Sequence, residues 1–154
     1  MQVASIPMES LAELLQLQLD TGGRARLVVT GDSMHPTLRH RKDVVYLAPI
    51  TRELGRGDLI LYRRASGQYI LHRIVSRPKD GKFICCGDNQ WQKEPVERTQ
   101  AIAIVNGFVR RGKEYSVTHF GYRCWVGFWV ILFPLRYPIL GTRRFLGRVR
   151  RKFR

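Results

Sequence analysis

The sequence contains little cysteine, and its last 40 residues contain no acid. Only three cysteines occur in 154 residues, and two of them, Cys85 and Cys86, are neighbours. This pattern excludes a disulfide framework, because the count is odd and adjacent strand residues point to opposite faces. The sequence is therefore typical of a protein from a reducing compartment, or of one indifferent to redox conditions.

Long apolar runs and metal-ligand spacings are also missing. The apolar run 124–133 has ten residues, whereas a membrane-spanning helix needs about 20. Residues 1–10 lack the basic leader of a signal peptide. The histidines and cysteines show neither a Cys-x-x-Cys nor a His-x-x-x-His spacing, so we expect no metal and no cofactor.

The excess of positive charge is concentrated at the end of the chain. Lys and Arg number 27 against 12 Asp and Glu, a formal net charge of +15. Residues 1–114 carry +6 of this charge, and the 40 residues after Glu114 carry +9. A basic tail suits nucleic acid or an anionic membrane surface equally well, so charge alone does not choose between them.

Hydrophobic patterning predicts a small, mainly β protein of one domain. Apolar residues recur at helical spacing over 8–20, which predicts an amphipathic helix that packs on the domain. An interfacial membrane helix is less favoured there, because its polar face carries acids. Short β-like runs separated by turn residues then predict antiparallel strands at 27–29, 44–47, 59–62, 69–71, 83–85 and 102–109, with hairpin turns at 66–67 and 79–81.

We divide the chain into an N-terminal helical segment (1–25), a β domain (26–118) and a hydrophobic, then arginine-rich tail (119–154). Two tryptophans in the run 124–133 fit a segment that lies among lipid headgroups or dips into one leaflet. The alternative is a strand or helix that covers the β domain. Each cation near an anionic surface adds roughly 1 kcal/mol, so we expect membrane contact through 124–154 and favour it over nucleic acid.

Four motifs follow one another in the β domain. The first is the turn Thr30-Gly31-Asp32-Ser33-Met34-His35-Pro36-Thr37-Leu38; Gly57–Tyr62, Tyr69–Val75 and Gly87-Asp88-Asn89 come next, and Ile104–Gly107 fits a closing strand. This order, over residues 26–115, resembles the family of signal peptidases and self-cleaving repressor peptidases. The resemblance implies an antiparallel β domain and a serine endopeptidase with Ser33 as nucleophile. It also implies a preference for small residues before the scissile bond.

Position 72 distinguishes two branches of that family. The sequence resembles the branch of endoplasmic-reticulum and spore-former signal peptidases, which implies that His72 is the general base where other members use lysine. An unperturbed histidine titrates near 6.5 and accepts a proton at neutral pH. No lysine lies between Lys42 and Lys79 to compete for the role. Cys85 and Cys86 lie in an apolar strand, and we interpret them as buried thiols and not as nucleophiles.

The resemblance also implies the supporting residues. Asp88 would be the third catalytic member and orient the imidazole, although an Asp-Asn pair also suits a simple turn. Glu94, at the family's second acidic position, is a candidate supporting acid. The Ser33 amide would stabilise the oxyanion; some relatives add a serine hydroxyl where Gly31 stands, so Thr30 is the nearest hydroxyl. Met34 and Pro36 would shape the turn and the substrate groove.

The chain departs from the family in its membrane anchor. A standard signal peptidase has a spanning helix before its nucleophile, and we expect none before Ser33. The positive-inside rule places the arginine-rich end on the cytoplasmic side of what we expect to be a bacterial cell membrane. The expected substrate is a precursor from which a leader is cut. Two alternatives are a self-cleaving repressor-like switch and a non-catalytic module, on the same fold, that binds membrane or nucleic acid.

Overall fold

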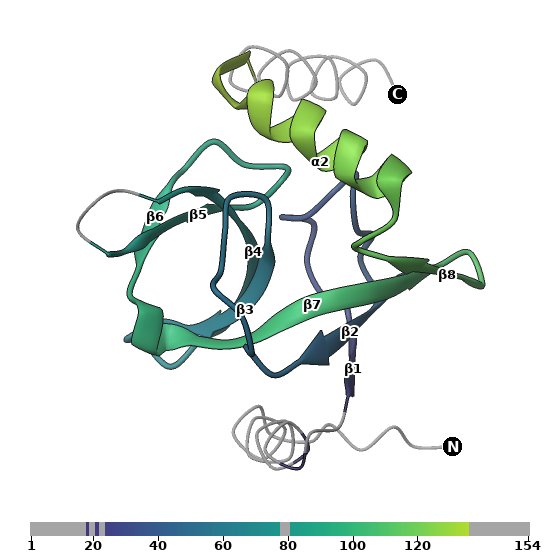
Figure 1. Cartoon of the computed structure of the whole chain (residues 1–154), viewed down its shortest axis with the longest axis horizontal. Helices are drawn as coiled ribbons and strands as arrows, with labels where there is room; N and C mark the ends of the chain where they lie inside the picture. Colours follow the sequence, from purple (N-terminus) through teal and green to yellow (C-terminus); the bar gives the residue numbers. More distant parts are fainter. Residues whose placement is uncertain (1–17, 19–20, 22–23, 78–80, 136–154) are drawn as a thin grey trace, which may run out of the picture.

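The computed structural model describes residues 18, 21, 24–77 and 81–135. This part of the chain is mainly β, which confirms the predicted fold class. Its strands form one antiparallel sheet in the order β1-β2-β7-β3-β4-β5-β6, with β8 paired to β7 (Figure 1). The strands are β1 (Ala25–Val28), β2 (Val44–Ala48), β3 (Leu59–Arg63), β4 (Tyr69–Ser76), β5 (Phe83–Cys86), β6 (Glu94–Val96), β7 (Ala101–Arg110) and β8 (Lys113–Ser116).

The six predicted runs all fall on strands, within a few residues at their ends. Strands β6 and β8 were not predicted, because each is short and carries charge or proline. The turn predicted at Ser66-Gly67 is present: the Arg64 amide donates to the Gln68 carbonyl at 2.9 Å and joins β3 to β4. Apart from residue 18, the helix predicted over 8–20 lies outside the described residues, and so does most of the turn at 79–81.

Two clusters of buried side chains hold the sheet together. One contains Met34 and Leu38, from the turn that carries Ser33, packed with Leu47 and Phe108. The other is built around β3, β4 and β5 and includes Tyr62, whose side chain is fully buried. Burying a Met or Leu side chain contributes about 1.5–3 kcal/mol. The burial of Met34 and Leu38 therefore fixes the Ser33 turn against the core.

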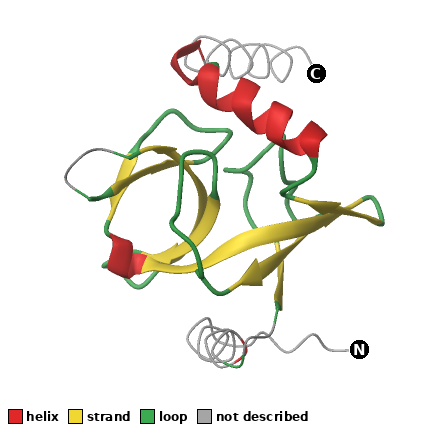
Figure 2. Cartoon of the chain, in the orientation of Figure 1, coloured by secondary structure: helices red, strands yellow, loops and turns green. Residues whose placement is uncertain are grey.

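Helix α2 (Phe120–Ile131) lies across one end of the curled sheet (Figure 2). It begins at the N-cap His119, whose ring accepts a hydrogen bond from the Gly121 amide. A short 3-10 helix, η2 (Phe133–Leu135), follows it. The apolar run 124–133 is therefore largely helical. Another short 3-10 helix, η1 (Arg98–Gln100), precedes β7. Among the described residues, no helix has both the length and the apolar character needed to cross a membrane.

Candidate active site

The turn after β1 presents Ser33 at the surface of the sheet. Gly31 has φ +83°, a backbone conformation that glycine adopts without strain, and its amide donates to His40 Nδ1 at 2.7 Å. The His35–Pro36 peptide is cis. Because Met34 is buried directly after Ser33, the serine side chain is left at the rim of the core and not within it.

A second turn, at Gly87–Gln90, supports the first. The Asn89 amide donates to the Ser33 carbonyl at 2.7 Å, and the Asn89 side chain donates to the Asp32 carbonyl at 3.2 Å. A Cβ atom at Gly87 would lie 2.6 Å from the Ser33 carbonyl oxygen and 3.1 Å from His72 Nε2. Gly87 therefore lies between the Ser33 backbone and the imidazole, where only glycine fits without displacing its neighbours.

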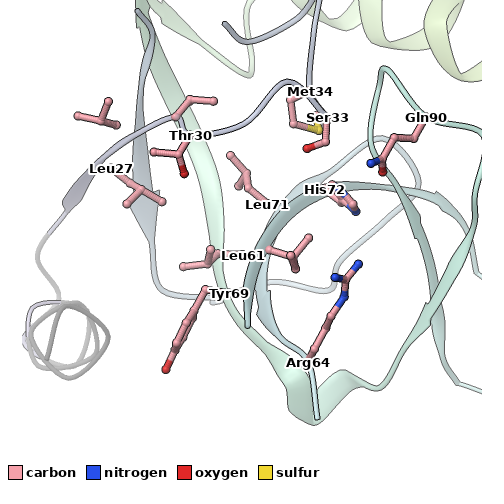
Figure 3. Close-up of a pocket in the computed structure, with 13 residues that line it drawn as sticks. Leu27, Thr30, Ser33, Met34, Leu61, Arg64, Tyr69, Leu71, His72 and Gln90 are labelled. Carbon is pink, nitrogen blue, oxygen red and sulfur yellow. The ribbon is translucent and has the colours of Figure 1, made fainter. Parts of the chain in front are cut away.

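Ser33 and His72 line one cavity of about 220 Å³. Figure 3 shows Ser33 on the turn and His72 on β4 around this space, with Leu61, Leu71 and Gln90 also on its wall. Within the described part of the chain no hydrogen bond joins the serine hydroxyl to the imidazole. Catalytic hydrogen bonds of this kind are often long before substrate binds.

His72 is buried in the middle of β4, opposite Ile60 of β3. Burial disfavours the charged imidazolium and lowers the pKa of His72 to about 4. The carboxylates of Glu94 and Asp88 partly oppose this shift, and the Arg64 guanidinium reinforces it. At neutral pH the imidazole is therefore uncharged, which is the form that accepts a proton.

The Nδ1 side of the imidazole faces a row of three side chains. The Tyr62 hydroxyl lies 3.3 Å from His72 Nδ1 and donates to Glu94 Oε2 at 2.8 Å. Arg64 donates to both oxygens of Glu94, each at 2.6 Å, and this contact holds the pKa of Glu94 below its usual range. Burial and the hydrogen bond to Glu94 raise the pKa of Tyr62. Glu94, the candidate supporting acid, is thus linked to His72 through Tyr62, for which the sequence predicted no role at the site.

Asp88, predicted to orient the imidazole, lies against Arg73, and its catalytic role stays a prediction. Its fully buried carboxylate accepts from Arg73 Nε at 2.9 Å and from Arg73 Nη2 at 2.7 Å. The Thr37 hydroxyl donates to Asp88 Oδ2 at 2.5 Å. Burial acts to lower the pKa of Arg73, but the charge and hydrogen bonds of Asp88 outweigh it, and the pKa is raised. The structure therefore makes Asp88 an ion-pair partner of Arg73, whereas the group at His72 Nδ1 is Tyr62.

Helix α2 reaches this buried ion pair with two side chains. Trp125 Nε1 donates to the Thr37 hydroxyl at 3.1 Å. The Tyr122 hydroxyl lies 3.4 Å from Arg73 Nη1. The helix, the Ser33 turn and the Gly87–Gln90 turn are therefore joined through one polar network.

The remaining predicted site residues divide between two cavities. Thr30 and Met34 line the cavity of Ser33, whereas Pro36 lines another, between the Ser33 turn and α2. The Ser33 amide has no hydrogen-bond acceptor among the described residues, so it is available to an oxyanion.

Cys85 and Cys86 are buried, as predicted, and burial raises the pKa of the Cys85 thiol to about 12. In the described ranges no three His, Cys, Asp or Glu side chains are grouped closely enough to hold a metal ion. A comparison with protein-family models and one with curated proteins gave no significant match to this chain.

Proposed function

We propose that this chain is a serine endopeptidase of the signal-peptidase type, with Ser33 as nucleophile and His72 as general base. The observation that supports it is the convergence of the Ser33 turn and a buried, neutral imidazole on one cavity, across the position of Gly87. A serine hydroxyl is a weak nucleophile until an adjacent base removes its proton. The substrate is a peptide or protein precursor from which a leader is removed.

The proposed reaction has two halves. His72 Nε2 takes the Ser33 hydroxyl proton while Oγ attacks the scissile carbonyl carbon, and the Ser33 amide stabilises the negative oxygen of the tetrahedral intermediate. The C–N bond then breaks, and the leaving amine takes the proton from His72. A water molecule, deprotonated by His72, next attacks the acyl carbonyl carbon. The C–Oγ bond breaks, His72 returns the proton to Ser33 Oγ, and the second product leaves. The reaction uses no cofactor.

The apolar wall of the cavity indicates what the substrate presents. Leu27, Val29, Leu61 and Leu71 lie beside Ser33 and Met34. A space of about 220 Å³ lined mainly by such side chains admits small apolar residues and disfavours charged ones. We propose that the residues before the scissile bond are small and uncharged.

Cleavage of a peptide library tests the proposal. The purified full chain is incubated with a library of mixed-sequence peptides, and new termini are identified by mass spectrometry. Cleavage is expected to disappear in Ser33→Ala and His72→Ala and to persist in Ser66→Ala, a change in the exposed β3–β4 turn. Full activity of purified Ser33→Ala would exclude the proposed nucleophile.

We also propose that the enzyme binds an anionic membrane surface through α2 and the basic segment after it. The outward face of α2 carries apolar side chains: the exposed fractions of Phe120, Phe128 and Ile131 are 80%, 56% and 73%. Their spacing puts them on one helical stripe, and Leu135 of η2, which follows the helix, is 54% exposed. The nine cations after Glu114 provide the matching charge for anionic lipid. The enzyme would act at the bacterial cell membrane, on the cytoplasmic side.

A further inference from the structure

Three hydrogen-bonded side chains occupy the side of His72 that faces away from the Ser33 turn. Tyr62 is diagonal to His72 across the antiparallel β3–β4 pair, since His72 pairs with Ile60 and Tyr62 pairs with Ile70. Glu94 reaches the same hydroxyl from β6, and Arg64 fixes Glu94 from the turn after β3. Side chains from β4 and β6 therefore meet at the phenolic oxygen of Tyr62, which lies on β3.

The direction of the hydrogen bonds follows from the number of protons available. A phenol has one proton to donate, and an ionised carboxylate can only accept. The bond from Tyr62 to Glu94 is 2.8 Å and its acceptor is charged, whereas the contact with His72 Nδ1 is 3.3 Å. The charged acceptor at shorter range takes the proton. The Tyr62 oxygen therefore accepts from the imidazole, and Nδ1 is the nitrogen that carries the hydrogen.

We propose that Tyr62, held by Glu94, is a positioning residue that fixes the His72 tautomer with Nε2 unprotonated. This inference rests on the proposed function, in which Nε2 is the atom that accepts the Ser33 proton. The opposite tautomer would present an N–H to the nucleophile and could not act as a base. Tyr62 does for this histidine what a buried aspartate does in a serine triad, but through a neutral oxygen whose proton is held by the carboxylate.

The burial of these groups supports the same assignment. The Tyr62 side chain is fully buried and its pKa is raised, so the phenol keeps its proton. Glu94 has its pKa lowered by Arg64, so it stays an acceptor. Tyr62 is not among the residues that line the cavity, and it therefore acts on the substrate only through His72.

Nitrogen-15 NMR of the full chain labelled at histidine tests this directly, because the chemical shifts of the two ring nitrogens identify the tautomer. At neutral pH His72 is expected to show protonated Nδ1 and unprotonated Nε2. In Tyr62→Phe the signals are expected to shift towards the other tautomer, with kcat for a cleaved library peptide falling about 10- to 100-fold and KM unchanged. The matched control is Tyr46→Phe, which removes an exposed Tyr–Glu hydrogen bond of 2.6 Å outside this cavity and should change neither quantity.

Each outcome decides one point. A wild-type spectrum with protonated Nε2 would overturn the inference, and this measurement stands even if Tyr62→Phe fails to fold. Unchanged tautomer or unchanged kcat in a folded Tyr62→Phe would also overturn it. A wild-type spectrum as expected, together with full peptidase activity in Ser33→Ala, would reject the proposed nucleophile and leave the hydrogen-bond assignment intact.

Discussion

The Ser33 carbonyl accepts a 2.7 Å hydrogen bond from the Asn89 amide, so the proposed nucleophile is held by a turn 56 residues further along the chain. In this arrangement Gly87 lies between the Ser33 carbonyl and the His72 imidazole, and there is no space for a side chain at position 87. Substitution at this glycine is therefore a way to disturb the site without changing either reactive side chain.

Gly87→Ala is expected to lower both stability and activity. The added Cβ would lie 2.6 Å from a backbone oxygen, and relieving such a contact costs about 1–3 kcal/mol. Urea unfolding and peptide cleavage measure the two effects. Gly127→Ala is the control, because its Cβ would meet nothing within 4 Å in α2, and alanine should stabilise the helix by about 0.5–1 kcal/mol. Equal stability of the two variants would contradict the described packing.

Asp88→Asn is expected to damage folding. The substitution leaves Arg73 buried without its counter-charge, which costs about 3–5 kcal/mol. Glu53→Gln is the control, since Glu53 forms ion pairs with Arg77 and Arg98 at an exposed position, where loss of an ion pair has little effect on stability. Denaturant unfolding compares the two. An Asp88→Asn variant of wild-type stability but no activity would restore the directly catalytic role first expected for Asp88.

The stability of the protein is expected to fall in acid through His72. The pKa of this side chain is lowered from 6.5 to about 4 in the folded state, so the unfolded chain binds the proton more readily. Stability from this group is complete above pH 6.5 and is lost as the pH falls towards 4, by about 3 kcal/mol in all. The measurement is the unfolding free energy at pH 7 and pH 4 for wild type and His72→Gln. If wild type and His72→Gln lose the same unfolding free energy between pH 7 and pH 4, the pKa of His72 is not lowered in the folded state.

The same pKa predicts the acid limb of the activity profile. The charges of Glu94, Arg64 and Asp88 act on the imidazole, but burial has the largest effect on its pKa. A general base with this pKa loses activity as the pH falls through about 4. The profile of kcat/KM against pH checks this, and an acid limb near 6.5 would show that His72 is solvated in the working enzyme.

Membrane binding is expected to depend on the outward face of α2. Phe128→Ser together with Ile131→Ser should weaken sedimentation with vesicles of mixed neutral and anionic phospholipid at least roughly tenfold, because both apolar side chains lose their contact with the acyl region. Val28→Ser removes an equally exposed apolar residue, 51% exposed, from β1 and should have little effect. Vesicle binding that changes neither with the double substitution nor with the content of anionic lipid would refute the proposed surface.

Much of the fold could be predicted from the sequence, because β-branched runs and turn residues are local signals. Ser33 and His72, which the resemblance implies as nucleophile and base, line one cavity, and their chemical roles stay a prediction. The partners of these residues could not be predicted in the same way. Asp88 bonds to Arg73 and not to its neighbour His72, since adjacent strand residues point to opposite faces. Tyr62 meets His72 only through the register of the β3–β4 hairpin.

The hydrogen bond from Trp125 to Thr37, and from Thr37 to Asp88, has a practical consequence for shortening this protein. A chain cut at residue 118 would keep every residue of the proposed reaction. It would also lose the tryptophan and the tyrosine that lie over the buried Arg73–Asp88 pair. Water would then reach an ion pair that the sheet alone does not cover. Loss of activity in such a truncation would therefore have two explanations: solvation of the buried ion pair, and loss of the proposed membrane-binding segment. Point substitutions on the outer face of α2 distinguish between them.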